Sequence, residues 1–265
     1  KFARGLIPPR SEIEGGRVLF NSLEFGIFLI VVYAFYLALP FRGQNWLLLV
    51  SSYIFYGWWD WRFLFLMIFS TSIDFWTGLV LDRGRLRPSE IIVPAAFLSS
   101  AGVILLGLDT SALFHGLIGA ASADVLVTPM MPYVIVGIPT FLAVAALVYY
   151  ALNSLGEEQR RRGCMILSIV AQLTVLGFFK YFNFFAQSLT EALASVGLRT
   201  PVNYLHIVLP VGISFYTFQS MSYAIDIYRR EIKPTHRFFD FALFVSFFPQ
   251  LVAGPIERAR NLLPQ

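Results

Sequence analysis

The sequence predicts an all-α, polytopic integral membrane protein with about eight transmembrane helices. Hydrophobic residues make up 57% of the 265 residues and charged residues only 14%, and the mean hydropathy is +0.68. A single water-soluble core of this size cannot bury so much apolar surface. The apolar residues form long runs and not the alternating pattern of barrel strands, so helices are left to satisfy the backbone in lipid.

The runs divide into segments close to the roughly 20 residues that one helix needs to cross a bilayer. They are residues 25–39, 46–59, 63–81, 91–108, 132–152, 164–184, 206–228 and 238–253. Between the second and third lies the sequence WWDWR at residues 58–62. Tryptophans beside charges are typical of a turn at the membrane interface, so we expect two spans here. One long kinked helix over residues 46–81 is the alternative.

Basic residues gather in three loops, at residues 83–87, 160–162 and 229–237, and the loops between them are poor in Lys and Arg. Because basic short loops favour the cytoplasm, we expect these three on the cytoplasmic side and the N-terminus outside. The basic residues within 1–17 oppose that placement. A full crossing by residues 238–253 would also carry the arginines after it outside, whereas a re-entrant segment would keep them inside.

The chain divides into a short extension and one membrane domain. Residues 1–19 contain Pro and Gly pairs and no apolar run, so we expect an extension on the membrane surface, followed by a domain over residues 20–265. The lone Cys164 has no disulfide partner and no metal-ligand spacing, so packing is its expected role. His115, His206 and His236 are expected to be solvated or capping residues. We expect no bound cofactor or metal and no nucleic-acid partner.

Asp74 lies well inside the third predicted span, where a charge is costly. Ser70 and Thr71 one turn before it and Thr77 one turn after fall on the same side of a helix. That side is expected to face the protein interior. A structural hydrogen bond is the favoured role of Asp74, and transport or catalysis is the alternative.

Two further charges lie near the ends of spans. Lys180, in the sequence GFFKYFNFF, is expected to reach the interface while its aromatic neighbours anchor the helix. Asp226 precedes Arg229 and Arg230 by about one turn, the favourable order of acid before base, so we expect an ion pair with one of them.

The seventh span contains many hydroxyl and amide groups. Gln219, Ser222, Tyr223 and Asp226 are spaced three and four residues apart and therefore share one side of a helix. Polar groups on one side of a helix in lipid are costly unless they face protein, water or a ligand. We interpret this side, together with Ser214, as a wall of a substrate tunnel. Adhesion between helices is the alternative.

After the eighth segment, the sequence Gly-Pro-Ile-Glu-Arg at residues 254–258 breaks the helix and places an acid at the membrane boundary. Irregular backbone at that depth requires a cover of protein or water. Glu257 is therefore the last tunnel candidate, and a simple helix-terminating turn is the alternative reading of this segment.

Two stretches resemble the membrane-bound O-acyltransferase family, in its bacterial branch that acetylates exported polysaccharides, typified by alginate O-acetyltransferase. They are LPVGISFYTFQSMSYAIDIYRR at residues 209–230 and FFPQLVAGPIERARNLLPQ at residues 247–265. FNSLEF at residues 20–25 and YIFYGWWDWRFLFLMIFSTSIDF at residues 53–75 extend the resemblance towards the N-terminus. The middle of the chain, residues 91–150, is less distinctive.

The resemblance implies a multi-pass protein of the bacterial inner membrane that transfers an acyl group. The donor would be acetyl-CoA or an acyl carrier in the cytoplasm, the acceptor an exported glycan, and a periplasmic acetyltransferase a partner. The family's histidines, one in a Trp-His motif and one later, would lie beyond Gln265. We therefore expect a truncated N-terminal part of the family's domain that is inactive alone. D-alanyl or other acyl transfer to a cell-wall polymer, a transporter or channel, and a non-catalytic membrane subunit are the alternatives.

Overall fold

The computed structural model describes residues 23–109, 127–195, 210, 212–253 and 259. The described chain is helical, apart from an isolated bridge between Leu108 and Val127. Its elements are α2 (Leu23–Ala38), α3 (Phe41–Arg83), α4 (Pro88–Gly102), a π-helical turn (Val103–Gly107), α6 (Met131–Asn153), α7 (Glu157–Ser195), α8 (Ile213–Tyr228), α9 (Phe238–Ser246) and α10 (Phe248–Ala253). The predicted all-α class is confirmed. The predicted surface extension at residues 1–19 lies outside the described residues.

Several described helices have the length and composition to cross a membrane. They are Asp60–Arg83, Pro88–Gly107, Met131–Asn153 and Glu157–Ser195, and Leu23–Ala38 and Phe238–Leu251 are shorter apolar helices. Every predicted segment falls on a described helix, although most of the seventh before Ile213 lies outside the description. The protein is therefore a helical membrane protein, as the composition predicted.

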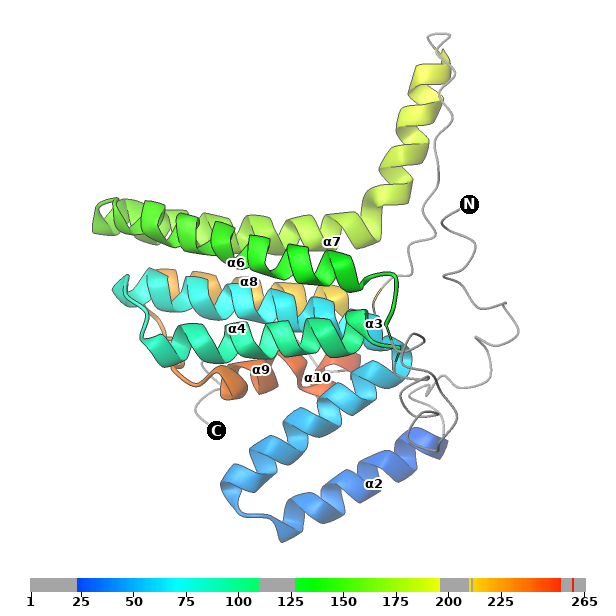
Figure 1. The fold of residues 1–265 in the computed structure, drawn as a ribbon. Coiled ribbons are helices and arrows are strands. Elements are labelled where there is room, and N and C mark those ends of the chain that lie inside the picture. Colours follow the sequence, from blue (N-terminus) through cyan, green and yellow to red (C-terminus); the bar gives the residue numbers. More distant parts are fainter. Residues whose placement is uncertain (1–22, 110–126, 196–209, 211, 254–258, 260–265) are drawn as a thin grey trace.

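The second and third predicted segments both belong to α3, which bends sharply at Asp60, where the backbone is extended (φ −164°, ψ 111°). The Asp60 carboxylate accepts hydrogen bonds from the Arg62 backbone N–H at 3.0 Å and from its guanidinium at 2.7 Å. It thereby caps the second half of α3. Figure 1 shows the two halves as the arms of a V. The predicted break is present, but no loop separates the two halves.

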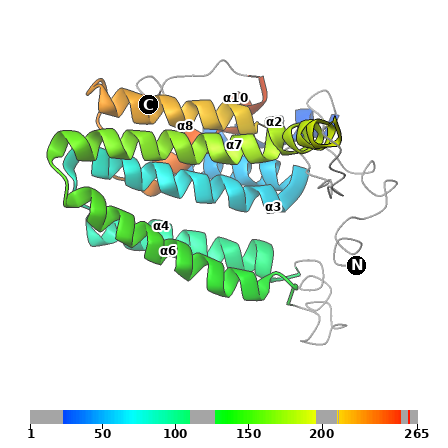
Figure 2. The ribbon, with the colours of Figure 1, turned by 90° about the horizontal axis from the view of Figure 1, so that it is seen from above.

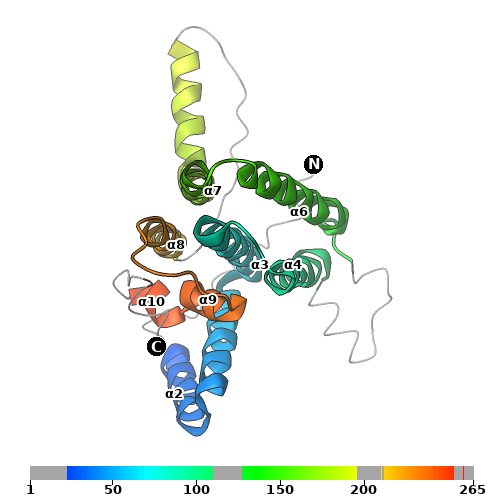
Figure 3. The ribbon, with the colours of Figure 1, turned by 90° about the vertical axis from the view of Figure 1, so that its left-hand side faces the viewer.

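The second half of α3 forms the centre of the bundle. It packs against α4, α7, α8 and α9, as the end-on view in Figure 3 shows. Gly78 permits the close approach of α8, because a Cβ atom there would lie 2.9 Å from the ring of Tyr223. Helix α6 lies beside α4 at the edge of the bundle (Figure 2). Most apolar side chains of α2 and α6 are exposed, which is what lipid-facing helices require.

The three basic segments lie at one end of the bundle, on the left in Figure 1, although residues 160–162, predicted as a loop, belong to the first turns of α7. The buried side chain of Arg161 donates hydrogen bonds to the carbonyls of Leu81 at 3.1 Å, Ile227 at 3.2 Å and Tyr228 at 2.8 Å. These carbonyls belong to the last turns of α3 and α8, whose helix dipoles favour a cation. The loops thus share one side, as the predicted topology requires. That this side is cytoplasmic stays a prediction.

Helix α7 is longer than the predicted segment 164–184. Its 39 residues extend for about 58 Å, well beyond the roughly 30 Å of hydrocarbon in a bilayer. The polar sequence EEQRRR consists of good helix formers and extends the helix at its start. At the other end the helix turns away from the bundle (Figure 1). Lys180 is exposed, and its ammonium group lies 5.5 Å from the ring centroid of Tyr181, which fits its predicted anchoring role.

The last predicted segment, 238–253, is divided at Phe247 into α9 and α10. Pro249 lies in the first turn of α10, where its missing N–H is tolerated. Even as one helix these 16 residues would extend for only about 24 Å. The segment is therefore shorter than the roughly 20 residues of a typical crossing, and its re-entry into the membrane stays a prediction.

Candidate functional site

The polar side of α8 faces other helices. Gln219, Tyr223 and Asp226 are buried and Ser222 is partly buried, whereas Phe215 and Phe218 beside them on the helix are 39% and 46% exposed. The helix therefore turns its amide and hydroxyl groups inward and its phenylalanines outward. This is the arrangement that both a tunnel wall and helix adhesion require.

Gln219 connects α8 to the divided segment beyond it. Its Nε2 donates to the carbonyl of Phe244 at 2.7 Å and lies 3.3 Å from Oε1 of Gln250, a weaker contact. Ser222 instead donates to the carbonyl of Gln219 within its own helix, at 2.8 Å. Ser214, in the first turn of α8, is partly buried. Glu257 lies outside the described residues, so the tunnel assignment stays a prediction.

Asp226 is buried, but the predicted ion pair with the next turn is not formed. Arg229 pairs with Glu231 at 4.0 Å, and Arg230 pairs with Glu157 at 3.5 Å. The prediction assumed a helix that continues past Asp226. The helix ends at Tyr228 and Arg230 has a left-handed backbone (φ 62°), so the chain turns the arginines away from Asp226.

Two buried hydroxyls precede Gln219 on α8. Within the part of the chain that the structure describes, the Tyr216 hydroxyl and the Thr217 Oγ1 have no hydrogen-bond partner. Tyr216 precedes Gln219 by three residues and extends the same polar side by one turn. Buried polar groups are normally satisfied, so this stretch of α8 calls for water or a ligand group. The spacing in the sequence could have added Tyr216 to the predicted set.

A second polar cluster surrounds Asp74 between α3 and α7. Ser168 Oγ donates to Asp74 Oδ1 at 2.7 Å, and Gln172 Nε2 donates to Asp74 Oδ2 at 2.5 Å and to Ser70 Oγ at 2.6 Å. Ser220 faces the same carboxylate from α8. All these side chains are buried, so the predicted inward orientation of Asp74 is confirmed. Its partners tie α3 to α7, which supports the structural role.

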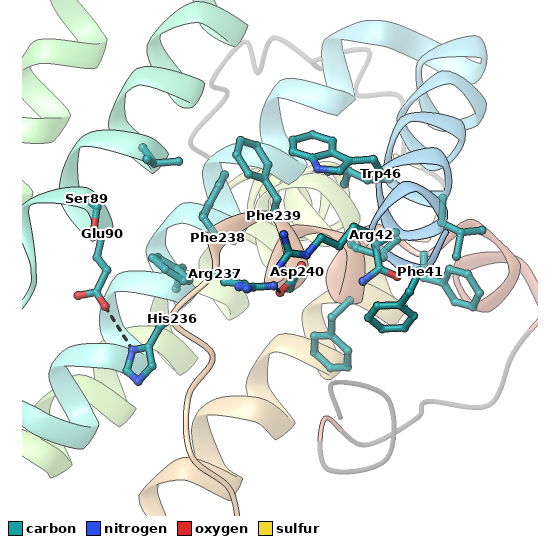
Figure 4. A pocket seen from close by; sticks show the side chains of 18 of the residues that line it. Phe41, Arg42, Trp46, Ser89, Glu90, His236, Arg237, Phe238, Phe239 and Asp240 are labelled. Carbon is teal, nitrogen blue, oxygen red and sulfur yellow. Dashed lines mark ion pairs between the residues drawn. The ribbon is translucent and has the colours of Figure 1, made fainter. Parts of the chain in front are cut away.

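A cavity of about 720 Å³ lies where α3, α4 and α9 begin. Its charged lining residues are Arg42, Glu90, His236, Arg237 and Asp240, and its aromatic lining residues are Tyr36, Phe41, Trp46, Phe75, Phe238, Phe239, Phe244 and Phe247. In Figure 4 the side chains of Arg42, Arg237 and Asp240 lie together near the Trp46 and Phe239 rings. None of the described tunnel candidates lines this cavity.

Glu90 fixes one edge of the cavity. Its buried carboxylate forms an ion pair with Arg83, accepts the backbone N–H of Arg87 at 2.7 Å and lies 3.2 Å from Nδ1 of His236. Its carbonyl accepts a hydrogen bond from the indole of Trp76 at 2.9 Å. His236, expected to be solvated or capping, is half exposed but paired. No local pattern in the sequence links Glu90 to His236, so this pairing could not be predicted.

No family model and no solved structure matches the sequence. Over 239 residues, or 90% of the chain, the sequence is 35% identical to the probable alginate O-acetylase of Pseudomonas aeruginosa and covers 32% of it. The sequence is therefore similar to those of alginate O-acetylases over most of its length. The corresponding protein of Azotobacter vinelandii is 33% identical over 90% of the chain and 34% of its own length.

A peptidoglycan O-acetyltransferase of Helicobacter pylori is 34% identical over 129 residues, 40% of the chain and 24% of that protein. These relatives confirm the resemblance to the polysaccharide-acetylating branch of the membrane-bound O-acyltransferase family. The chain spans about a third of the length of the alginate O-acetylases that it matches.

Proposed function

We propose that the protein is a membrane O-acetyltransferase that modifies an exported polysaccharide. The observation that carries the proposal is the 35% identity, over 90% of the chain, with a probable alginate O-acetylase. The alginate and peptidoglycan relatives are both named for acetyl transfer to a carbohydrate polymer. The proposal therefore specifies a polysaccharide hydroxyl as acceptor and leaves the polymer open.

The proposed reaction moves an acetyl group across the inner membrane. A thioester donor, acetyl-CoA or an acyl carrier, delivers the acetyl group at the end of the bundle where the basic loops meet. The C–S bond of the donor breaks, a C–O bond to the acceptor forms, and the acceptor proton passes to the released thiolate by way of a general base. By the family resemblance, a histidine would act as that base. A periplasmic acetyltransferase is the proposed partner that completes transfer to the glycan.

In this scheme α8 contributes binding surface and no catalytic residue. The unpartnered hydroxyls of Tyr216 and Thr217 support a path that holds water or substrate along this helix. Gln219 and Asp226, which are also buried on α8, would shape the path between α8 and the α9–α10 segment. The remaining candidates Ser214, Ser222, Tyr223 and Glu257 are proposed to belong to the same wall.

Deletion of the complete gene from its host tests the proposal. The expected result is loss of base-labile acetate from the exported polysaccharide, with the amount of polymer unchanged and acetylation restored by the wild-type gene. An acetate content that does not change on deletion would contradict the proposal. Loss of polymer export, with normal acetylation of what remains, would instead support a transporter.

A further inference from the structure

The cavity at the start of α3, α4 and α9 has a polar edge and an apolar wall. The edge comes from the first turn of α3, the first turn of α4 and the loop before α9. These segments contribute Arg42, Ser89 and Arg237 to the lining of the cavity. Two of these elements adjoin the basic loops 83–87 and 229–237. The polar edge therefore lies towards the end of the bundle where those loops meet, a position suited to lipid headgroups.

One positively charged side chain at this edge is available to bind an anion. Glu90 is already neutralised by Arg83, and Arg237 faces Asp240 at 3.8 Å, with its side chain 68% exposed. Arg42 has no acidic partner among the residues that the structure describes. Figure 4 shows that its side chain extends towards Arg237 and Asp240. A guanidinium presents paired N–H donors that match a phosphate. The guanidinium groups of Arg42 and Arg237 both line this edge of the cavity.

The wall of the cavity suits an acyl chain. Trp46 stacks at an angle on Phe239 with ring centroids 4.7 Å apart, and Phe239 contacts Phe97 at 5.5 Å. Leu49 and Phe244, both buried, continue the apolar lining. Trp46 itself is 51% exposed, as expected for an aromatic residue at the membrane interface. A free phosphate would leave most of the 720 Å³ unfilled.

We infer that this cavity binds an anionic phospholipid, with its phosphate at Arg42 and Arg237 and an acyl chain along the Trp46–Phe239 wall. Basic pockets between membrane helices near the inner leaflet suit anionic headgroups. The inference uses only the described cavity and does not depend on the acetyltransferase proposal.

Binding of defined lipids to the complete protein tests the inference. The protein is purified in detergent, and native mass spectrometry measures retention of dioleoyl phosphatidylglycerol and of dioleoyl phosphatidylcholine, which share their acyl chains. We expect phosphatidylglycerol to bind on the order of tenfold more tightly, and the Arg42→Gln/Arg237→Gln double variant to lose this preference. Arg162→Gln, which removes an exposed arginine of the same basic end outside the cavity, should retain it.

The conservative variant Arg42→Lys keeps the charge but loses the planar fork, so it should retain part of the preference. Equal retention of the two lipids by the wild type, or an unchanged preference in the double variant, would overturn the inference. Acetyl-CoA provides the second arm of the experiment. If acetyl-CoA binds in an arginine-dependent way and phosphatidylglycerol does not, the phosphate site belongs to the acyl donor and the lipid assignment is wrong.

Discussion

The carboxylate of Asp74 and two hydroxyls of α8 differ in how they are satisfied, although Gln172 Oε1 beside Asp74 also has no hydrogen-bond partner within the described residues. The carboxylate of Asp74 receives hydrogen bonds from Ser168 and Gln172 of α7. On α8, the hydroxyls of Tyr216 and Thr217 have no partner within the described part of the chain. An unpaired buried hydroxyl costs about 1–3 kcal/mol, so α8 bears a cost that Asp74 avoids.

The comparison separates structural from functional polarity in a membrane helix. Both regions consist of common polar side chains at helical spacing, and the sequence predicted a structural role for Asp74 and a tunnel wall for α8. The identity of the partner distinguishes them, since donors from a neighbouring helix fix a packing arrangement, while unsatisfied groups remain available to water or substrate. The following substitutions test this distinction.

Asp74→Ala should have the largest effect, on stability. It removes the acceptor for Ser168 and Gln172 and leaves both donors buried, so we expect the free energy of unfolding to fall by about 2–4 kcal/mol. Thermal unfolding in detergent measures the change. Asp82→Ala, an exposed acid of the same helix, is the matched control and should stay within about 0.5 kcal/mol of the wild type. An unchanged free energy of unfolding in the Asp74 variant would contradict the structural role of Asp74.

Gln219→Ala and Asp226→Ala should act on transfer more than on protein amount. We expect acetyl transfer per molecule to fall on the order of tenfold, because these side chains shape the proposed path while the helix still inserts. The measurement is polysaccharide acetylation normalised to membrane protein level. Gln187→Ala, the same change at an exposed position on α7, serves as control. Normal acetyl transfer by both α8 variants would show that this side of the helix only packs against neighbouring helices.

Thr217→Val and Thr71→Val remove the same hydroxyl group at two buried positions that differ in hydrogen bonding. The Thr71 hydroxyl donates to the carbonyl of Met67 at 2.7 Å, so its loss should lower stability by about 1 kcal/mol. The Thr217 hydroxyl has no partner within the described residues, so valine should be neutral or stabilising by up to about 1 kcal/mol. Urea or thermal denaturation compares the pair. The opposite order of stability would mean that Thr217 is satisfied in the membrane.

Topology gives the smallest expected signal. Cysteines placed at Arg162 or Lys233, in a Cys164→Ser background, should resist an impermeant thiol reagent added from outside, because both loops lie at the basic end. A cysteine at Ser122, in the stretch between residues 109 and 131 that contains no Lys or Arg, should react and so shows that the reagent works. Labelling of either basic loop would reverse the orientation.

Local patterns predicted much of this fold. Apolar runs located the helices, the tryptophan-rich sequence around Asp60 located the break in α3, and helical spacing identified the buried side of Asp74. Each of these features depends on residues within one or two turns of each other, so composition and period are sufficient to identify them.

Features that depend on distant residues were not predictable. Glu90 meets His236 because α4 and the loop before α9 begin at the same end of the bundle, and no sequence period records that. Apolar content also does not specify backbone conformation. It therefore predicted neither the break between α9 and α10 at Phe247 nor the left-handed backbone of Arg230. The cavity likewise arises from three segments that only the fold brings together.

The bond between Asp74 and Ser168 also has a consequence for biogenesis. The two residues are 94 positions apart, so at 5–20 residues per second the ribosome takes roughly 5 to 20 s to add the partner after the aspartate. During that interval, the newly inserted α3 carries an acidic side chain without its donors from α7. Release of α3 alone into lipid is unfavourable for that time. The aspartate therefore favours retention of α3 at the insertion machinery until α7 can supply its hydrogen-bond donors.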